Sequence, residues 1–424
     1  MGPTAIPSSV AAAPRRVSIE RLRGGLLWLT GASGAFVFME PGPYELTTLI
    51  AMLVFAATGL ALRPGLMALV LLLTLHDLGY SFALIAVVGE AAARTWVVVS
   101  WYLSATALFF AAMLGVRTAS RLDLLLRGTM ASAIVTSAAA IGGYFHLVPG
   151  LSELFVRYGR AQGTFNDPNV LGAFLVLPIL LALQRLLTGR PRAALGAALL
   201  LGLLAGALLL SFSRGAWGQC AFAAGLMMLL HLLTSPSPTA RARIALMAIL
   251  AVAALAAVVA ALLTMEQVAA VFRERATLEQ SYDLGRFGRF GRHVLGFLMA
   301  LDRPGGLGPL QFRNFFPEDP HNAFLNAFMS GGWLSGFSYL TLTAVTIAAG
   351  LRTAFIATPW RQTFLAVYAA YVAVAAESAI IDSDHWRHYF LLLGVLWGLM
   401  IAARAHRARS WPATASRARA MTTG

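Results

Sequence analysis

The chain has no lysine, almost no cysteine and few charged residues of any kind. Its single cysteine, Cys220, excludes an intrachain disulfide and says nothing about the redox compartment. Only 12% of the 424 residues are charged, against 58% that are hydrophobic, and the mean hydropathy is +0.73. A soluble domain cannot bury so much apolar surface, so the composition excludes a soluble protein and indicates a polytopic membrane protein.

Twelve apolar stretches come close to the roughly 20 residues that a spanning helix needs. We therefore predict an all-α fold of about 12 transmembrane helices in one integral membrane domain, residues 21–403. Residues 1–20 are expected to be a disordered cytoplasmic tail rather than a cleaved signal peptide, and residues 404–424 a basic cytoplasmic tail. A long, partly helical periplasmic loop, residues 266–322, separates spans 9 and 10. The predicted spans are residues 25–39, 44–62, 66–88, 95–116, 128–147, 170–187, 194–212, 215–233, 244–265, 323–349, 362–381 and 389–403.

The arginines set the orientation of these spans. All 32 basic residues are arginines, and the net charge is +14. With the N-terminus inside, the cytoplasmic loops and tails carry 20 arginines and the short external loops only 5. Both termini are therefore expected in the cytoplasm. In a soluble protein this charge would suggest nucleic acid as a partner, but here membrane topology accounts for it, and we expect no nucleic acid partner.

Three short polar motifs interrupt the apolar chain, and the predicted topology places all three on the external face. They read Arg160-Ala-Gln-Gly-Thr-Phe-Asn-Asp-Pro-Asn169, Ser213-Arg-Gly215 and Asp319-Pro-His-Asn322. Four of the five arginines in the short external loops lie in or beside polar motifs, on a face that normally avoids positive charge. Arginine, histidine and amide groups gathered there predict a site for an anionic substrate carried on a lipid.

His321 is the candidate general base of this site. Asp319 is expected to be an N-cap and Pro320 the first helical residue, which puts His321 at the second helical position. The positive end of the helix dipole disfavours an imidazolium there, and a neutral histidine can accept a proton. The alternative is that His321 only forms hydrogen bonds at the level of the lipid headgroups.

Arg160 and Arg214 are the candidate phosphate ligands. A guanidinium holds phosphate in a bidentate fork, and an arginine near the membrane plane needs an anion to compensate its cost. Asp167 and Pro168 are expected to begin a further helix, whose free N–H groups could also face phosphate oxygens. For Asp167 the alternative is plain helix capping, and for Arg214 it is contact with lipid phosphates.

The ordered set of motifs resembles the O-antigen ligase and polymerase family. The resemblance covers about residues 150–345, and the long external loop lies before His321 as in that family. Asp167 departs from the pattern, since many members carry a small or neutral residue there. The motifs that carry the resemblance are Arg160-x-x-Gly-Thr-Phe-x-x-Pro-Asn, Ser213-Arg214-Gly215, Pro304-x-x-Gly-x-Gly308, and His321-Asn322-x-x-Leu325 followed by Gly332 and Gly336.

The resemblance implies a metal-independent, inverting glycosyltransferase at the periplasmic face of the bacterial inner membrane. Such an enzyme moves an oligosaccharide from undecaprenyl diphosphate to the hydroxyl of a lipid A core or a growing polysaccharide, without a nucleotide sugar or other cofactor. Arg160 and Arg214 would hold the diphosphate and His321 would activate the acceptor. Ligase and polymerase cannot be told apart, and a protein O-oligosaccharyltransferase or a lipid-linked glycan flippase remains an alternative.

Further polar residues of the external face are candidate substrate ligands. In the long loop, Phe287, Phe290, Val294, Phe297 and Leu301 recur at helical spacing, which predicts an amphipathic helix lying at the lipid headgroups with arginines along its edge. The alternative is a basic anchor without chemistry. The substrate-binding candidates are Arg157, Asn166, Asn169, Arg286, Arg289, Arg292, Asn322 and Arg387.

Two other features compete with these motifs. Asp382 and Asp384 form an Asp-x-Asp pair that could bind a divalent cation, although a polar lining role is favoured and no metal site is predicted. Glu377, near the outer end of its span, is an alternative base. The pair His76-Asp77 lies in the middle of a predicted span, where ionisable residues suggest proton-coupled transport or, as we prefer, an internal structural contact.

Overall fold

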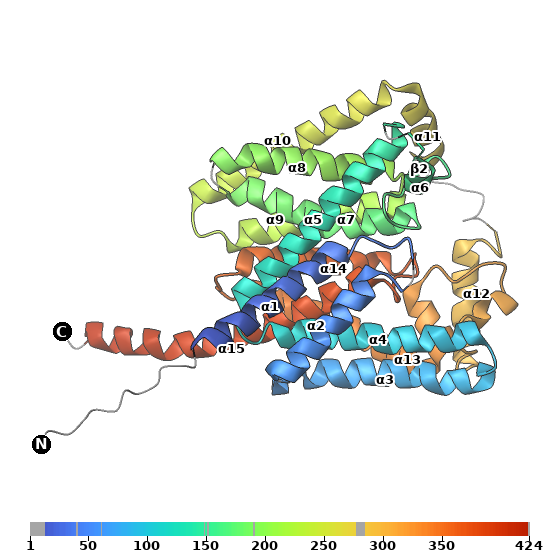
Figure 1. The fold of residues 1–424 in the computed structure, drawn as a ribbon, viewed down its shortest axis with the longest axis horizontal. Coiled ribbons are helices and arrows are strands. Elements are labelled where there is room, and N and C mark those ends of the chain that lie inside the picture. The colour runs from blue at the N-terminus through green and yellow to red at the C-terminus, as the bar shows by residue number, and fades with distance from the viewer. Residues whose placement is uncertain are drawn as a thin grey trace, which may run out of the picture.

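Long helices that run side by side make up almost the whole protein (Figure 1). The computed structural model describes residues 13–422, apart from residues 40, 61, 148, 151, 190 and 277–284. Within these residues the chain forms fifteen α-helices, three short 3₁₀ turns and one two-residue hairpin of strands β1 (Val156–Arg157) and β2 (Arg160–Ala161). The predicted all-α fold is confirmed, and its long apolar helices support the predicted polytopic membrane protein.

Each of the twelve predicted apolar stretches contains a helix. Among the described residues, eight helical segments are long and apolar enough to cross a membrane: Pro64–Val87 (with α3 at its centre), α4, α5, α7, α9, α10, α13 and Arg387–Arg409 of α15. α2 and Ala194–Leu210 of α8 are shorter apolar helices, and the total of twelve spans stays a prediction. The helices are α1 (Ala13–Ser33), α2 (Pro43–Gly59), α3 (Met67–Leu84), α4 (Ala91–Met113), α5 (Thr118–Tyr144), α7 (Pro168–Thr188), α8 (Pro191–Leu210), α9 (Arg214–Thr234), α10 (Pro238–Leu263), α13 (Ala323–Ala354), α14 (Arg361–Glu377) and α15 (Arg387–Thr422).

The predicted N-terminal tail is too long, because α1 begins at Ala13 and residues 13–20 are helical. Glu20 anchors this part of the helix: its carboxylate accepts hydrogen bonds from Arg121 at 2.9 and 3.0 Å and from Arg23 at 3.4 Å. A largely polar segment therefore continues the first helix, because a charged partner on α5 holds it. Residues 1–12 of the predicted tail lie outside the described residues.

Small residues bring the helices close together. This is usual in membranes, because the lipid is itself apolar and the hydrophobic effect does not drive one helix against another. α3 packs along α13, and a Cβ added at Gly79 of α3 would lie 2.6 Å from the backbone nitrogen of Ser335. α1 packs along α5 in the same way, where a Cβ at Gly31 would lie 2.6 Å from the nitrogen of Thr129. α7 and α15 are mostly buried in the bundle, whereas α10 lies at its periphery.

The long loop contains three helical pieces: α11 (Glu266–Ala276), α12 (Arg289–Leu301) and the 3₁₀ turn Gln311–Asn314. The short helix α6 (Ser152–Phe155) lies elsewhere, between α5 and β1. α12 runs across the direction of α3 and α4 at one end of the bundle (Figure 1). Its outer face exposes apolar side chains such as Phe290 and Val294, while Gly296 and Ala300 are buried against its neighbours. The predicted amphipathic helix is confirmed; its depth in a membrane stays a prediction.

α13 is broken at Gly332, where the backbone has φ 68° and ψ −168°. The loop after α12 enters this break: the N–H of Trp333 donates to the Pro304 carbonyl at 2.9 Å, and the N–H of Leu307 donates to the Met329 carbonyl at 2.6 Å. Gly306 must be glycine, because a Cβ there would lie 2.6 Å from the nitrogen of Gly332. The glycine motif Pro304–Gly308 thus fastens the long loop to the helix that follows His321.

Candidate functional site

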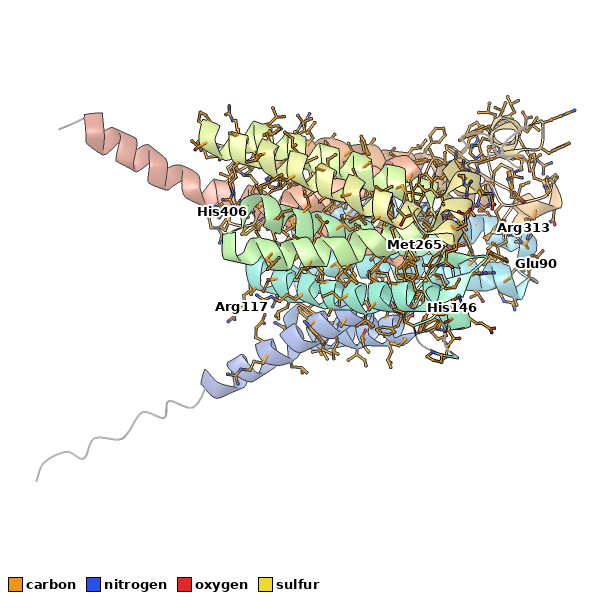
Figure 2. All side chains as sticks on the ribbon, turned by 90° about the horizontal axis from the view of Figure 1, so that it is seen from above. Glu90, Arg117, His146, Met265, Arg313 and His406 are labelled. Atoms are coloured by element: carbon orange, nitrogen blue, oxygen red, sulfur yellow. The ribbon has the colours of Figure 1, made fainter. Side chains whose placement is uncertain are left out.

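The polar motifs gather at one end of the bundle. Figure 2 labels Arg313 and His146 toward this end, and Arg117 and His406 toward the other. Arg313 belongs to the loop before His321, since its guanidinium pairs with Asp319. We call the end that carries His321 the site end, and the end that carries His406 the opposite end.

Arg160 begins strand β2 and is held over the start of two helices. Its Nε donates to the Ser211 carbonyl at 2.8 Å, and its Nη2 donates to Asn169 Oδ1 at 2.7 Å. Asp167 is the N-cap of α7, as predicted: its Oδ1 accepts the backbone N–H of Asn169 at 2.6 Å. Arg160 therefore touches both the helix that follows its own motif and the residues just before Ser213.

Arg157 lies across the hairpin from Arg160, with which it is paired in register. Its guanidinium donates to the Asn166 carbonyl at 2.7 Å and lies over the ring of Tyr158. The Asn166 amide in turn donates to the Val37 carbonyl at 2.7 Å. Hairpin and helix start therefore form one hydrogen-bonded unit, which holds Arg157 and Arg160 at the site end.

Ser213 caps α9, since its hydroxyl accepts the N–H of Ala216 at 3.3 Å. Arg214 is the first residue of that helix. The next residue is a glycine that Glu377 approaches closely: a Cβ at Gly215 would lie 2.5 Å from Oε1 of Glu377. This contact brings the end of α14 against the start of α9, so that Glu377 lies beside the Ser-Arg-Gly motif.

The predicted cap before α13 is wrong by three residues. Asn322 is the N-cap, and its Oδ1 accepts the N–H of Leu325 at 3.0 Å. Asp319 is instead paired with Arg313, and His321 precedes the helix with a left-handed backbone, φ 47°. The physical reason is distant in sequence: the carboxylate of Asp382 accepts the N–H groups of both His321 (3.2 Å) and Asn322 (3.0 Å).

Asp382 also contacts the imidazole of His321. His321 Nδ1 lies 3.1 Å from Asp382 Oδ2, and the two side chains are 40% and 24% exposed. Because a carboxylate only accepts hydrogen bonds, Nδ1 carries the proton, and Nε2 of a neutral ring keeps its lone pair. Burial raises the pKa of Asp382, and the hydrogen bond from His321 opposes this rise. An oriented, water-accessible histidine is the arrangement that a general base requires.

A continuous series of contacts joins the three motifs. The N–H of Ala323, the first residue of α13, donates to the carbonyls of Ser378 at 2.8 Å and Ile381 at 3.1 Å. Ser378 follows Glu377, which lies against Gly215. Arg160 is bound to the carbonyl of Ser211, two residues before the cap of α9. The starts of α7, α9 and α13 therefore meet around the end of α14.

Two residues of α12 contact the His321 loop: His293, which sequence reasoning missed, and Arg292, which it named only as a substrate ligand. His293 Nε2 lies 2.8 Å from the Pro320 carbonyl, and the buried Arg292 forms a 2.8 Å ion pair with Glu318. Burial lowers the pKa of His293. Both residues lie on the polar edge of the amphipathic helix, but nothing in the sequence tells which segment that edge faces. Of the other candidates on the long loop, Arg286 lies over the ring of Phe287, and Arg289 begins α12.

Arg387, the first residue of α15, forms an ion pair with Glu45 of α2, with 2.5 Å between Nε and Oε1. Its guanidinium also lies 5.8 Å from the centre of the Tyr44 ring. The side chain is only 14% exposed. The structure thus places this candidate between α15 and α2, where it holds the two helix starts together.

Three of the competing residues, His76, Asp77 and Asp384, are buried. Asp384 accepts hydrogen bonds from Tyr80 at 3.2 Å and Asn326 at 2.7 Å. The ring of His76 packs on Tyr80, with centres 4.7 Å apart. His76 Nδ1 lies 2.7 Å from the Ser335 hydroxyl and Asp77 accepts from Ser100 at 2.5 Å. Asp382 and Asp384 thus accept hydrogen bonds from different protein groups. In the described part of the chain, no group of three or more His, Cys, Asp or Glu is suited to a metal ion.

Comparison of the chain with protein-family models and with curated proteins gave no match to either.

Proposed function

We propose that this chain is a membrane glycosyltransferase of the O-antigen ligase and polymerase type. It would transfer an oligosaccharide from undecaprenyl diphosphate to an acceptor hydroxyl of a lipopolysaccharide core or a growing polysaccharide. The observation that carries the proposal is the exposed His321–Asp382 pair just before α13, which the contacts described above link to Arg160 on strand β2 and to the start of α9 with Arg214. Such a displacement needs a proton acceptor for the incoming hydroxyl and cationic groups for the leaving diphosphate.

In the proposed mechanism His321 Nε2 removes the proton of the acceptor hydroxyl. The acceptor oxygen forms a bond to the anomeric carbon, and the bond from that carbon to the diphosphate oxygen breaks. Direct attack from the opposite face inverts the anomeric configuration. Asp382 stabilises the imidazolium that forms, as a carboxylate on Nδ1 does in other acid–base pairs.

The leaving diphosphate gains negative charge during this step, and Arg160 and Arg214 would stabilise it. A hydrogen bond to a charged group contributes about 1.5–3 kcal/mol, and more where charge develops in the transition state. Two helix starts, those of α7 and α9, lie beside these arginines. The positive ends of their dipoles favour the same anion.

The proposed location is the bacterial inner membrane, with both termini in the cytoplasm and the site end facing the periplasm. The arginine distribution supports this orientation, because 20 arginines lie in the loops and tails assigned to the cytoplasm. A lipid-linked donor would reach the site from the outer leaflet. The acceptor could be a lipid A core, a polysaccharide or a protein hydroxyl.

A flippase is the less favoured alternative. Transport through the bundle would draw on polar groups along a cavity through both leaflets. His76 and Asp77, the intramembrane pair that suggested it, instead contact Ser335 and Ser100 in a buried cluster. Their burial, at 1% and 0% exposure, favours a structural role.

The test uses purified protein, undecaprenyl-diphosphate glycan and each acceptor class. His321→Asn removes the base but keeps a residue that tolerates the left-handed backbone. Transfer should fall by about 10²–10⁴-fold, the usual contribution of a general base. His146→Asn is the matched control, since His146 is an exposed histidine at the same end with φ 53°. Equal activity of both variants and wild type would remove His321 from the mechanism.

A further inference from the structure

A hollow lined by three arginines lies at the opposite end of the bundle. Its volume is about 400 Å³, within the range of small-molecule sites. We call it the arginine hollow. The lining residues are Arg352, Thr353, Ile356, Arg404, Arg407 and Ala408.

Two helices build the arginine hollow, and both begin at the site end. α13 starts after Asn322, and Arg352 lies in its last turn, about 40 Å away at 1.5 Å per residue. α15 starts at Arg387, and Arg404 lies about 25 Å further along it. The hollow is therefore remote from the proposed catalytic site. Figure 2 places His406, which lies between Arg404 and Arg407 in the chain, at this end.

The three positive charges are not explained by helix capping alone. Arg352 lies in the last turn of α13, where the helix dipole favours a cation. Arg404 and Arg407 lie inside α15, which continues to Thr422, and their i,i+3 spacing puts like charges on one face. None of the described residues that line the hollow is acidic. Three arginines that line one hollow favour an anion there.

The surroundings favour a lipid over a free anion. Leu351 and Phe355, next to the hollow on the same helix end, are large apolar residues with 45% and 54% exposure. Ile356 and Ala408 add an apolar wall inside it. A phospholipid would place its phosphate among the guanidinium groups and its acyl chains over these apolar side chains. Inorganic phosphate would use only the arginines.

We propose that the arginine hollow binds the headgroup phosphate of an anionic phospholipid. The bound lipid bridges the end of α13 and the middle of α15. Basic pockets between helices are a known kind of site for anionic lipid headgroups. The proposal concerns a lipid that stabilises the protein, and it holds whether or not the site end transfers glycans.

The experiment uses delipidated full-length protein in detergent. Phosphatidylglycerol, phosphatidylcholine with the same acyl chains, and inorganic phosphate are added separately, and binding is followed by native mass spectrometry and by the unfolding temperature. We expect phosphatidylglycerol to bind and raise the unfolding temperature, and the other two to do so far less. In the double variant Arg404→Gln/Arg407→Gln the affinity for phosphatidylglycerol should fall about 30-fold, at roughly 1 kcal/mol for each arginine lost.

The matched control is Arg241→Gln/Arg243→Gln, which removes the same charge from two exposed arginines near the start of α10. It should bind phosphatidylglycerol like wild type. Three results would overturn the proposal: unchanged affinity in the Arg404/Arg407 variant, an equal loss in the control, or full competition by inorganic phosphate.

Discussion

His321 and Asp382 lie 61 residues apart in the chain, yet the imidazole Nδ1 and the carboxylate Oδ2 are 3.1 Å apart. The same carboxylate accepts the backbone N–H groups of His321 and Asn322. One side chain on the loop between α14 and α15 thus fixes both the conformation of the segment before α13 and the orientation of the imidazole. The predictions below test this arrangement and its supports.

Asp382→Asn should lower the turnover of glycan transfer by at least about tenfold, with a smaller effect on donor binding. An amide cannot stabilise the imidazolium, and it can present the wrong partner to Nδ1. Steady-state kinetics with a lipid-linked donor measures the effect. Asp302→Asn, an exposed aspartate at the end of α12, is the control and should transfer at the wild-type rate. An Asp382→Asn enzyme as fast as wild type would show that the carboxylate of Asp382 does not assist His321.

The pH dependence should reflect the raised pKa of Asp382. Its ionised form is the active one, so transfer should rise with pH through a value above the ordinary 3.8 of an aspartate. Because the folded state holds this proton more tightly, the free energy of unfolding should fall as pH rises through the same window. In Asp382→Asn both the rise of the transfer rate and the fall of the free energy of unfolding should be absent from this pH range. If either change persists in the variant, a group other than Asp382 causes it.

Glu318→Gln should disturb the support that α12 gives to the His321 loop. The change leaves Arg292, 3% exposed, without its charged partner, and should cost about 1–3 kcal/mol of stability. Glu266→Gln is the control, since its ion pair with Arg273 is exposed on both sides and should contribute little. Unfolding temperatures of the two variants measure the difference. Equal temperatures would show that the Arg292–Glu318 pair does not stabilise the loop.

Gly215→Ala should destabilise the meeting point of α9 and α14. The new Cβ would lie 2.5 Å from Glu377 Oε1, so the carboxylate or the helix start has to move, at a cost of about 1–3 kcal/mol. Gly218→Ala on the same helix meets nothing within 4 Å, and it should stabilise by roughly 0.5–1 kcal/mol. Opposite shifts in unfolding temperature are expected. A neutral Gly215→Ala variant would mean that Glu377 does not press on this turn.

The sequence by itself determined the class of the protein and the position of its helices. An apolar content of 58% with 12% charge leaves only a membrane protein, and the apolar stretches mark where helices must form, because backbone groups in lipid have to pair within their own segment. Local signals also sufficed for the Asp167 cap and for the amphipathic α12, since capping and periodicity involve residues only a few positions apart.

Only the tertiary structure decided which polar groups meet. The cap before α13 was placed wrongly because Asp382, on a loop that packing alone brings there, accepts the N–H groups of His321 and Asn322. Asn322, and not Asp319, then caps the helix. His293 reaches the Pro320 carbonyl, and Asp384 accepts a hydrogen bond from Tyr80, through contacts that span tens to hundreds of residues. Hydropathy and capping report on neighbours in the chain, whereas a site depends on neighbours in space.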